Sequence, residues 1–263
     1  MDLGLKNKVA MVGGASKGLG FAVARAVAAE GALVSIAARD EAAVHRAAEA
    51  IKRETGVNAL ACAGDLSTAD AVARWHAATV ETFGGVDMLY ANTGGPPTGT
   101  ALAFDDAAWY TAFDLLILSV VRAVRLVVPT MKARGAGAIL VGTSSTVKEP
   151  VPNLALSNVM RSGVTSLVKT LAGELAPARI RINSLLPGRI STDRLTYLDE
   201  VNAQRAGIPV DEQRKRASSV IPLGRYGEPE EFGRAGAFLL SDAASYITGA
   251  SLQVDGGLLK GLL

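Results

Sequence analysis

Short runs of apolar and β-branched residues recur along the chain, separated by longer segments with apolar residues at helical spacing. Leu19, Val23 and Ala26, for example, follow one another at the three- and four-residue steps that place side chains on one helix face. The short runs predict strands and the longer segments predict helices. The predicted strands cover residues 9–12, 33–37, 59–62, 86–91, 138–141, 180–186 and 251–254.

The alternation of strand and helix predicts right-handed crossovers and a parallel sheet with helices on both faces. It continues from residue 8 to about residue 187 without a linker rich in Pro or Ser. At roughly 150 residues per domain, 263 residues allow one large domain or two small ones. Because no boundary interrupts the pattern, we expect one doubly wound (Rossmann) α/β domain over residues 1–263, with a seven-stranded sheet.

The segment 188–225 breaks the alternation with residues of mixed charge, before a predicted last helix over 229–240 and the last strand. In doubly wound sheets, insertions after the carboxyl end of a strand overlie the ligand crevice. This segment is therefore a candidate substrate lid.

Composition and charge exclude several classes of function. The chain has 27 basic and 25 acidic residues and no run of five like charges, so we expect neither a nucleic-acid nor a membrane partner. The single cysteine, Cys62, cannot form an intramolecular disulfide, and no ligand spacing indicates a metal site. No stretch is apolar enough for a signal peptide or membrane span, so we expect a soluble, cytoplasmic protein.

The first predicted strand ends in a glycine-rich turn that opens directly into a helix. Glycines there let backbone N–H groups approach a pyrophosphate at the positive end of the helix dipole. Glycines also make tight turns without a ligand, but their place between the first strand and first helix favours nucleotide binding. The candidate cofactor contacts in the turn are Gly14, Ser16, Lys17, Gly18, Leu19 and Gly20.

Several motifs in the same order resemble the short-chain dehydrogenase/reductase family over nearly the whole chain. Gly14, Gly18 and Gly20 match the family's Thr-Gly-x-x-x-Gly-x-Gly turn, with Gly13 in the place of the threonine. The resemblance implies a nicotinamide cofactor and a small-molecule carbonyl or alcohol substrate. The further cofactor contacts that it implies are Asp65, Leu66, Asn92, Gly94, Pro187, Gly188, Ile190 and Thr192.

The end of the second strand decides the choice of cofactor. A carboxylate there would bind the ribose 2′-hydroxyl of NAD, but this chain has Ala38 followed by Arg39. Arg39 and Lys17 could both bind a 2′-phosphate, so we expect NADP(H) to be preferred over NAD(H). The alternative is that Arg39 is a solvated loop residue paired with Asp40 or Glu41.

The resemblance also implies where the catalytic residues of the family would fall. The family serine corresponds to Ser144, but the tyrosine position is Ser157, the lysine position is Arg161 and the asparagine position is Leu116. A serine hydroxyl is far less acidic than a phenol, and an arginine stays charged, so the usual proton relay is absent. The chain resembles a divergent, 3-oxoacyl-carrier-protein reductase-like subgroup that lacks the catalytic Tyr and Lys.

Hydride transfer can survive this loss. Acid–base help is worth roughly 10² to 10⁴ in rate, whereas holding the reactants together can supply ~7 to 11 kcal/mol. We expect Arg161 to bind the cofactor ribose and act electrostatically, while Ser144 and Ser157 hydrogen-bond a carbonyl oxygen and a water that donates the proton. Alternative acids, which could equally be solvated surface residues, are Lys148, Glu149 and Tyr197.

Two functions remain open from the sequence. The first is an NADP(H)-dependent oxidoreductase that interconverts a carbonyl and a secondary alcohol, which the lid segment favours. The second is a catalytically silent NADP(H)-binding protein with a sensing or assembly role, which the missing tyrosine favours. The family resemblance also implies a homo-oligomer, a tetramer or dimer, formed through long helices over 105–133 and 153–176.

Overall fold

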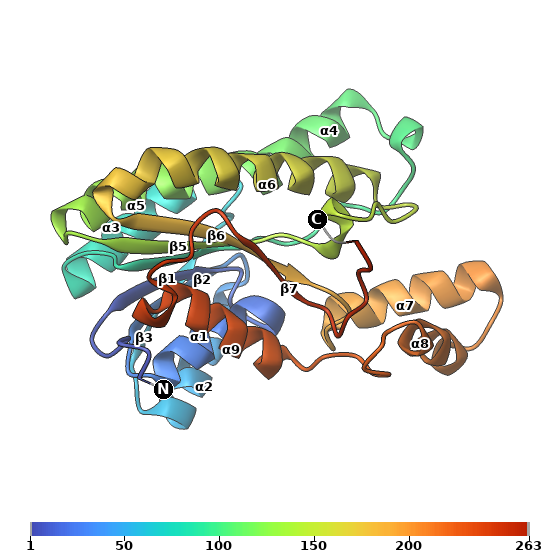
Figure 1. The fold of residues 1–263 in the computed structure, drawn as a ribbon, viewed down its shortest axis with the longest axis horizontal. Coiled ribbons are helices and arrows are strands. Elements are labelled where there is room, and N and C mark those ends of the chain that lie inside the picture. Colours follow the sequence, from blue (N-terminus) through green and yellow to red (C-terminus); the bar gives the residue numbers. More distant parts are fainter. Residues whose placement is uncertain (1, 262–263) are drawn as a thin grey trace.

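All strands of the central sheet run parallel in the computed structural model, which describes residues 2–261 (Figure 1). The strand order is β3-β2-β1-β4-β5-β6-β7, so the chain reverses its direction of travel across the sheet between β1 and β4. The doubly wound fold and its seven-stranded sheet are confirmed. The strands are β1 (Val9–Gly13), β2 (Leu33–Ala38), β3 (Ala59–Ala63), β4 (Met88–Ala91), β5 (Gly137–Gly142), β6 (Ile180–Pro187) and β7 (Ser251–Val254).

Helices cover both faces of the sheet, which is why the central strands read as continuous apolar runs. One face carries α1 (Gly18–Ala29), α2 (Glu41–Thr55) and α9 (Pro229–Leu240). On the other face lie α3 (Ala69–Phe83), α5 (Ser119–Ala133) and α6 (Ala155–Leu175), as Figure 1 shows. Each face buries its own apolar core, and the two cores together form one domain.

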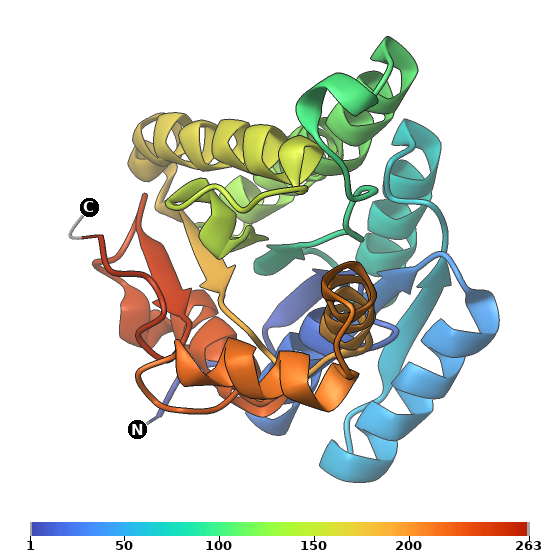
Figure 2. The same ribbon diagram turned by 90° about the vertical axis from the view of Figure 1, so that its right-hand side faces the viewer.

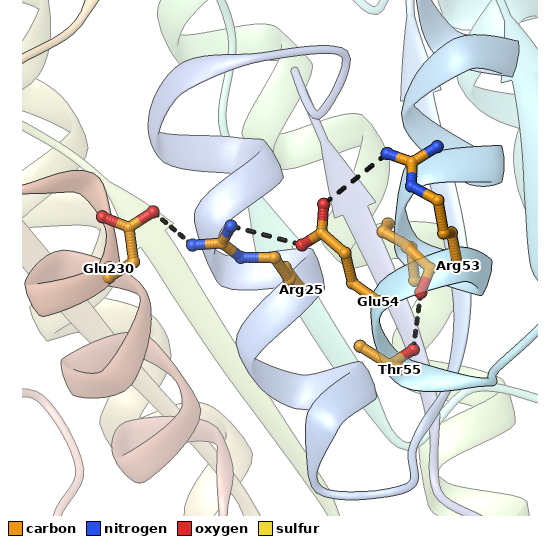
Figure 3. A network of polar contacts seen from close by, with 6 residues as sticks. Arg25, Arg53, Glu54, Thr55 and Glu230 are labelled. Carbon is orange, nitrogen blue, oxygen red and sulfur yellow. Dashed lines mark hydrogen bonds and ion pairs between the residues drawn. The ribbon is translucent and has the colours of Figure 1, made fainter.

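Ion pairs join the three helices of the first face (Figure 3). Arg25 of α1 lies between Glu54 of α2, at 3.3 Å, and Glu230 of α9, to which it also donates. Arg53 contacts the same Glu54 carboxylate at 3.9 Å. Such partly exposed pairs contribute up to about 1 kcal/mol each, so they align the helices while the apolar core supplies the stability.

The long helix expected over 105–133 is present, but it is interrupted by a π-helical segment. It consists of α4 (Asp106–Phe113), a π-helical segment (Asp114–Leu118) and α5. The helix expected over 153–176 is α6. The fourth strand begins two residues later than predicted, at Met88. Just before it, the Asp87 carboxylate accepts the Val9 N–H at 2.7 Å and pairs with Arg134.

The segment 188–225 contains two helices that the sequence did not indicate, α7 (Asp193–Ala206) and α8 (Val210–Ser219). Figure 2 shows both in front of the carboxyl end of the sheet. Buried Asp199 anchors α7, since its carboxylate pairs with Arg189 at 3.1 Å and accepts the Tyr226 hydroxyl at 2.9 Å. No helix within residues 2–261 is both long and apolar enough to cross a membrane.

Candidate active site

A cleft of about 630 Å³ opens at the carboxyl end of the sheet and is covered in part by α7. This is where a doubly wound sheet binds its ligand, beside the reversal of strand order. Of the residues expected to bind the cofactor or to replace the family's catalytic serine, tyrosine and lysine, all but Gly20 line it. The lining candidates are Gly14, Ser16, Lys17, Gly18, Leu19, Arg39, Asp65, Leu66, Asn92, Gly94, Ser144, Ser157, Arg161, Pro187, Gly188, Ile190 and Thr192.

The glycine turn has the geometry of an anion cradle. Gly14 and Gly18 both have φ of +60°, and a Cβ on Gly20 would lie 2.3 Å from the Gly14 carbonyl oxygen. Lys17, the N-cap residue of α1, makes no side-chain capping bond, and the first turn of α1 holds no acidic residue. The backbone N–H groups that open α1 are thus available to an anion, which fits a dinucleotide pyrophosphate.

Two further close approaches shape the floor of the cleft. A Cβ on Gly14 would lie 2.8 Å from Nδ2 of Asn92, which follows β4. A Cβ on Gly188, which follows β6, would lie 2.6 Å from the Cα of Asp255. Both glycines leave room that a larger residue would fill, so the shape of the cleft depends on them.

Arg39, one of the two cations expected at a 2′-phosphate, is not paired with the neighbouring carboxylates. Asp40 accepts the Ala43 N–H at 2.9 Å as the N-cap of α2, and no ion pair joins Arg39 to Asp40 or Glu41 in the described chain. Arg39 extends instead toward Gly94, where Nη2 lies 3.9 Å from the position of a Cβ. The described residues thus show no ion pair that would support the alternative, in which Arg39 pairs with Asp40 or Glu41.

Ser157 and Arg161 lie one turn apart on α6, and both face the cleft. Nη1 of Arg161 donates to the carbonyl oxygens of Gly142 at 2.9 Å and Thr143 at 3.2 Å, at the end of β5. Burial lowers the pKa of Arg161 to about 10, so the guanidinium is still charged at neutral pH. Ser144 follows directly, and its Oγ accepts the Thr146 N–H at 3.2 Å.

Leu116, which the family resemblance assigns to the asparagine position, is buried in the π-helical segment. Tyr90 is a polar neighbour of Arg161 that no sequence pattern indicated, because it lies within the apolar strand β4. Its hydroxyl is buried without a hydrogen-bond partner, 2.7 Å from where a Gly142 Cβ would stand. Burial raises the pKa of Tyr90, and the nearby charge of Arg161 opposes that rise.

Arg194, on the first turn of α7, is a cleft residue to which the sequence analysis gave no role. Its Nη2 donates to the Pro96 carbonyl oxygen at 3.1 Å, so α7 contacts the loop after β4 across the cleft. The repeat of Arg194, Leu198 and Val201 at helical spacing could have revealed this face. The alternative acids are not part of the cleft lining of residues 2–261: Lys148, Glu149 and Tyr197.

The polar groups that line the cleft are hydroxyls, amides, guanidinium groups and carboxylates, which can bind a ligand by charge and hydrogen bonding. Among the described residues, no cluster of three or more His, Cys, Asp or Glu could hold a metal ion. The fold and the glycine turn are those of a dinucleotide-binding domain of the Rossmann type, with hydroxyl and guanidinium groups lining the same cleft.

Comparison with known proteins places the chain in a family. The family described as Enoyl-(Acyl carrier protein) reductase matches residues 14–259. Dehydrogenase/reductase SDR family member 4 from Homo sapiens is 32% identical over 256 residues, 96% of this chain and 88% of the relative. The chain belongs to the short-chain dehydrogenase/reductase family of oxidoreductases.

Two solved structures show which cofactors similar folds hold. L-sorbose reductase from Gluconobacter frateurii, complexed with NADPH and L-sorbose, is 33% identical with a TM-score of 0.95 and 100% coverage of both chains. A 7α-hydroxysteroid dehydrogenase complexed with NADH is 28% identical with a TM-score of 0.88, covering 100% of this chain and 98% of its own. Nicotinamide cofactors are thus common to these neighbours, in both forms.

Proposed function

We propose that this protein is an NADP(H)-dependent oxidoreductase that interconverts a carbonyl and a secondary alcohol without the tyrosine and lysine of its family. The observation that carries the proposal is the meeting of Ser144, Ser157 and Arg161 in the same cleft as the glycine turn. We place the enzyme among the 3-oxoacyl-carrier-protein reductase-like members of the family, on the motifs that the sequence shares with them.

The cofactor contacts follow from the geometry of the cleft. The free N–H groups at the start of α1 would hold the pyrophosphate, while Arg39 would hold the 2′-phosphate. No carboxylate at the end of β2 repels that phosphate, because Ala38 stands there. We therefore propose a preference for NADP(H), although similar folds hold either form.

The bound cofactor would supply a hydride to the carbonyl carbon, or accept one from the alcohol in reverse. Ser144 and Ser157 would donate hydrogen bonds to the carbonyl oxygen, and Arg161 would stabilise the negative charge that develops there. A water held by the two hydroxyls would deliver the proton to that oxygen and complete the secondary alcohol, and the hydroxide left behind would take up a proton from solvent. Arg161 would also bind the nicotinamide ribose in place of the family lysine.

The segment 188–225 would act as the substrate lid. It carries α7, whose residues Arg194, Leu198 and Val201 line the cleft, and it reaches Pro96 on the opposite wall. Closure would exclude bulk water from the hydride-transfer step. We also propose a homo-oligomer, a dimer or tetramer, formed through the long helices over 105–133 and 153–176.

The experiment that tests this function is NADPH oxidation by the purified protein against aldehydes, ketones, quinones and β-ketoacyl thioesters. Turnover with one class, abolished or strongly reduced in Ser144→Ala, would support an enzyme. The second candidate, a silent NADP(H)-binding protein, is favoured by the serine at position 157. Tight NADPH binding without turnover of any class would establish that candidate instead.

A further inference from the structure

The substrate end of the cleft, between α6 and α7, has an unbalanced positive charge. Among the described lining residues on α6 and α7, the charged side chains are Arg161, Asp193, Arg194 and Arg205. The other groups that face this end are hydroxyls, amides and apolar side chains. Asp193, the lining carboxylate next to Arg194, is engaged with Lys17 on the glycine turn, with Nζ and Oδ2 2.7 Å apart.

Neither Arg161 nor Arg194 has a carboxylate partner within ion-pair distance in residues 2–261. Arg161 donates only to two backbone carbonyls, and Arg194 donates to the Pro96 carbonyl and stacks 5.5 Å from the Tyr197 ring centre. The charge of Arg194 further lowers the pKa of Arg161, so the two guanidinium groups repel each other.

Two other cations of the same cleft, Arg189 and Lys17, each have a carboxylate partner. Arg189 pairs with buried Asp199 at 3.1 Å, and Lys17 pairs with Asp193. Arg161 is half-buried and Arg194 is exposed, so the expected gain from a bound anion is relief of their mutual repulsion and a charged partner for both. The missing partner is therefore expected to arrive with the substrate.

The face of α7 shows how the rest of such a substrate would lie. Arg194, Leu198, Val201 and Arg205 line the cleft and share one helix face. Arg194 and Arg205 are 11 residues apart, which at 1.5 Å per residue is about 16.5 Å. Two apolar side chains fill the interval, so the positive charge beside Arg161 is followed by an apolar wall.

We propose that the substrate is an oxo acid, whose carboxylate is bound by Arg161 and Arg194 and whose apolar body lies along Leu198 and Val201. This inference rests on the proposed oxidoreductase function. A carboxylate suits the planar guanidinium fork, which it can accept in a bidentate manner. Because Arg161 adjoins Ser157 on α6, the carboxylate stands close to the carbonyl, as in a 2-oxo or 3-oxo acid.

The test compares matched pairs of substrates, each a medium-chain 2-oxo or 3-oxo acid and its methyl ester, in NADPH oxidation. The acid should have a kcat/KM higher than its ester by roughly tenfold or more, the worth of a charge-assisted hydrogen bond. Arg194→Gln should remove that advantage mainly by raising KM for the acid. Arg216→Gln, the same change at an exposed position on α8 outside the cleft lining, should alter both substrates by less than about twofold.

A binding measurement separates this inference from the proposed function. In the presence of NADP⁺, the oxo acid should raise the melting temperature of the wild type more than the ester does, and Arg194→Gln should abolish the difference. Esters reduced as well as acids, with no difference in melting temperature, would overturn the oxo-acid assignment and leave the oxidoreductase intact. NADPH binding without reduction of any carbonyl would refute the proposed function itself.

Discussion

Lys17 and Asp193 form an ion pair across the mouth of the cleft, with Nζ 2.7 Å from Oδ2. The pair joins the glycine turn to the first turn of α7, and both side chains are about three-quarters exposed, at 74% and 76%. Exposed pairs contribute little to folding, up to about 1 kcal/mol. The contact therefore bears on the position of α7 and on the charge that a cofactor phosphate would meet at the glycine turn.

Asp193→Asn should free Lys17 and remove a carboxylate from the phosphate side of the cleft. We expect the dissociation constant for NADPH to fall relative to that for NADH, with the free energy of unfolding changed by less than about 1 kcal/mol. Calorimetric titration with both cofactors measures this. Glu200→Gln removes the same charge from an exposed position on α7 outside the cleft lining and should change nothing. An unchanged or weakened NADPH affinity would argue against Lys17 as a phosphate contact.

Arg39→Asp should reverse the cofactor preference, because a carboxylate repels a 2′-phosphate and can bind a 2′-hydroxyl. At a hundredfold excess over its Kd, NADPH should stabilise the wild type by ~2.7 kcal/mol, or roughly 5 to 10 °C in melting temperature. NADH should become the better stabiliser of the variant. Arg46→Asp, an exposed arginine on α2 outside the cleft lining, is the matched control. Equal shifts from both cofactors in both proteins would contradict the assignment.

Arg161→Ala should affect both stability and binding. The variant leaves the Gly142 and Thr143 carbonyls without their guanidinium donor, which should lower the free energy of unfolding by roughly 1 to 3 kcal/mol. Loss of a ribose contact should weaken NADPH binding by roughly 1.5 to 3 kcal/mol. Ser157→Ala should leave both nearly unchanged and reduce turnover alone. Urea unfolding measures the effect on stability, and titration with NADPH measures the effect on binding. An unaltered NADPH affinity in Arg161→Ala would show that Arg161 does not contact the cofactor.

The double variant Ser157→Tyr, Arg161→Lys introduces the residue types that the family resemblance assigns to these two positions. A phenol is a better acid than a serine hydroxyl, so reduction of neutral ketones should rise. Activity on anionic substrates should fall, because a lysine offers no planar fork to a carboxylate. Steady-state rates on both substrate types test this. A loss of activity on both types, in a variant that still melts cooperatively, would show that these residues serve another chemistry.

Glu231 gives the fold a defined acid sensitivity. Its hydrogen bonds from Arg225, both at 2.8 Å, and from the Glu228 N–H lower its pKa from 4.5 to about 2. Because the folded-state pKa is the lower one, the carboxylate contributes stability above pH 4.5 and loses it as the pH falls toward 2. Glu231→Gln should therefore flatten the fall in melting temperature over that window. An identical fall in the variant would show that the pair has no effect on stability.

Much of the fold could be predicted because its cause is local in the sequence. The strands are buried on both faces, so their apolar runs are continuous, and the helices between them keep an apolar stripe. Helices α7 and α8 were missed because their sequences are polar. What holds α7 is buried Asp199, whose partners Arg189 and Tyr226 come from 10 and 27 residues away.

The sequence predicted which residues line the candidate site better than it predicted the hydrogen bonds that they make. Motif order was enough to bring Ser144, Ser157 and the glycine turn to one cleft. The hydrogen bonds of Arg161 depend on how closely α6 packs against the end of β5, which no local pattern records. Arg194 reaches the site only because α7 folds back over the sheet. Its hydrogen bond to the Pro96 carbonyl oxygen is one of the tertiary contacts in that arrangement.

We propose that this cleft transfers a hydride with Ser157 and Arg161 at the positions that the family resemblance assigns to a tyrosine and a lysine. The most direct test is reduction of an oxo acid with NADPH carrying deuterium at both C4 positions, followed by mass spectrometry of the product. We expect one deuterium on the carbon that bore the carbonyl, and its loss in Ser144→Ala. Tight NADPH binding with no deuterated alcohol from any carbonyl substrate would contradict the proposal.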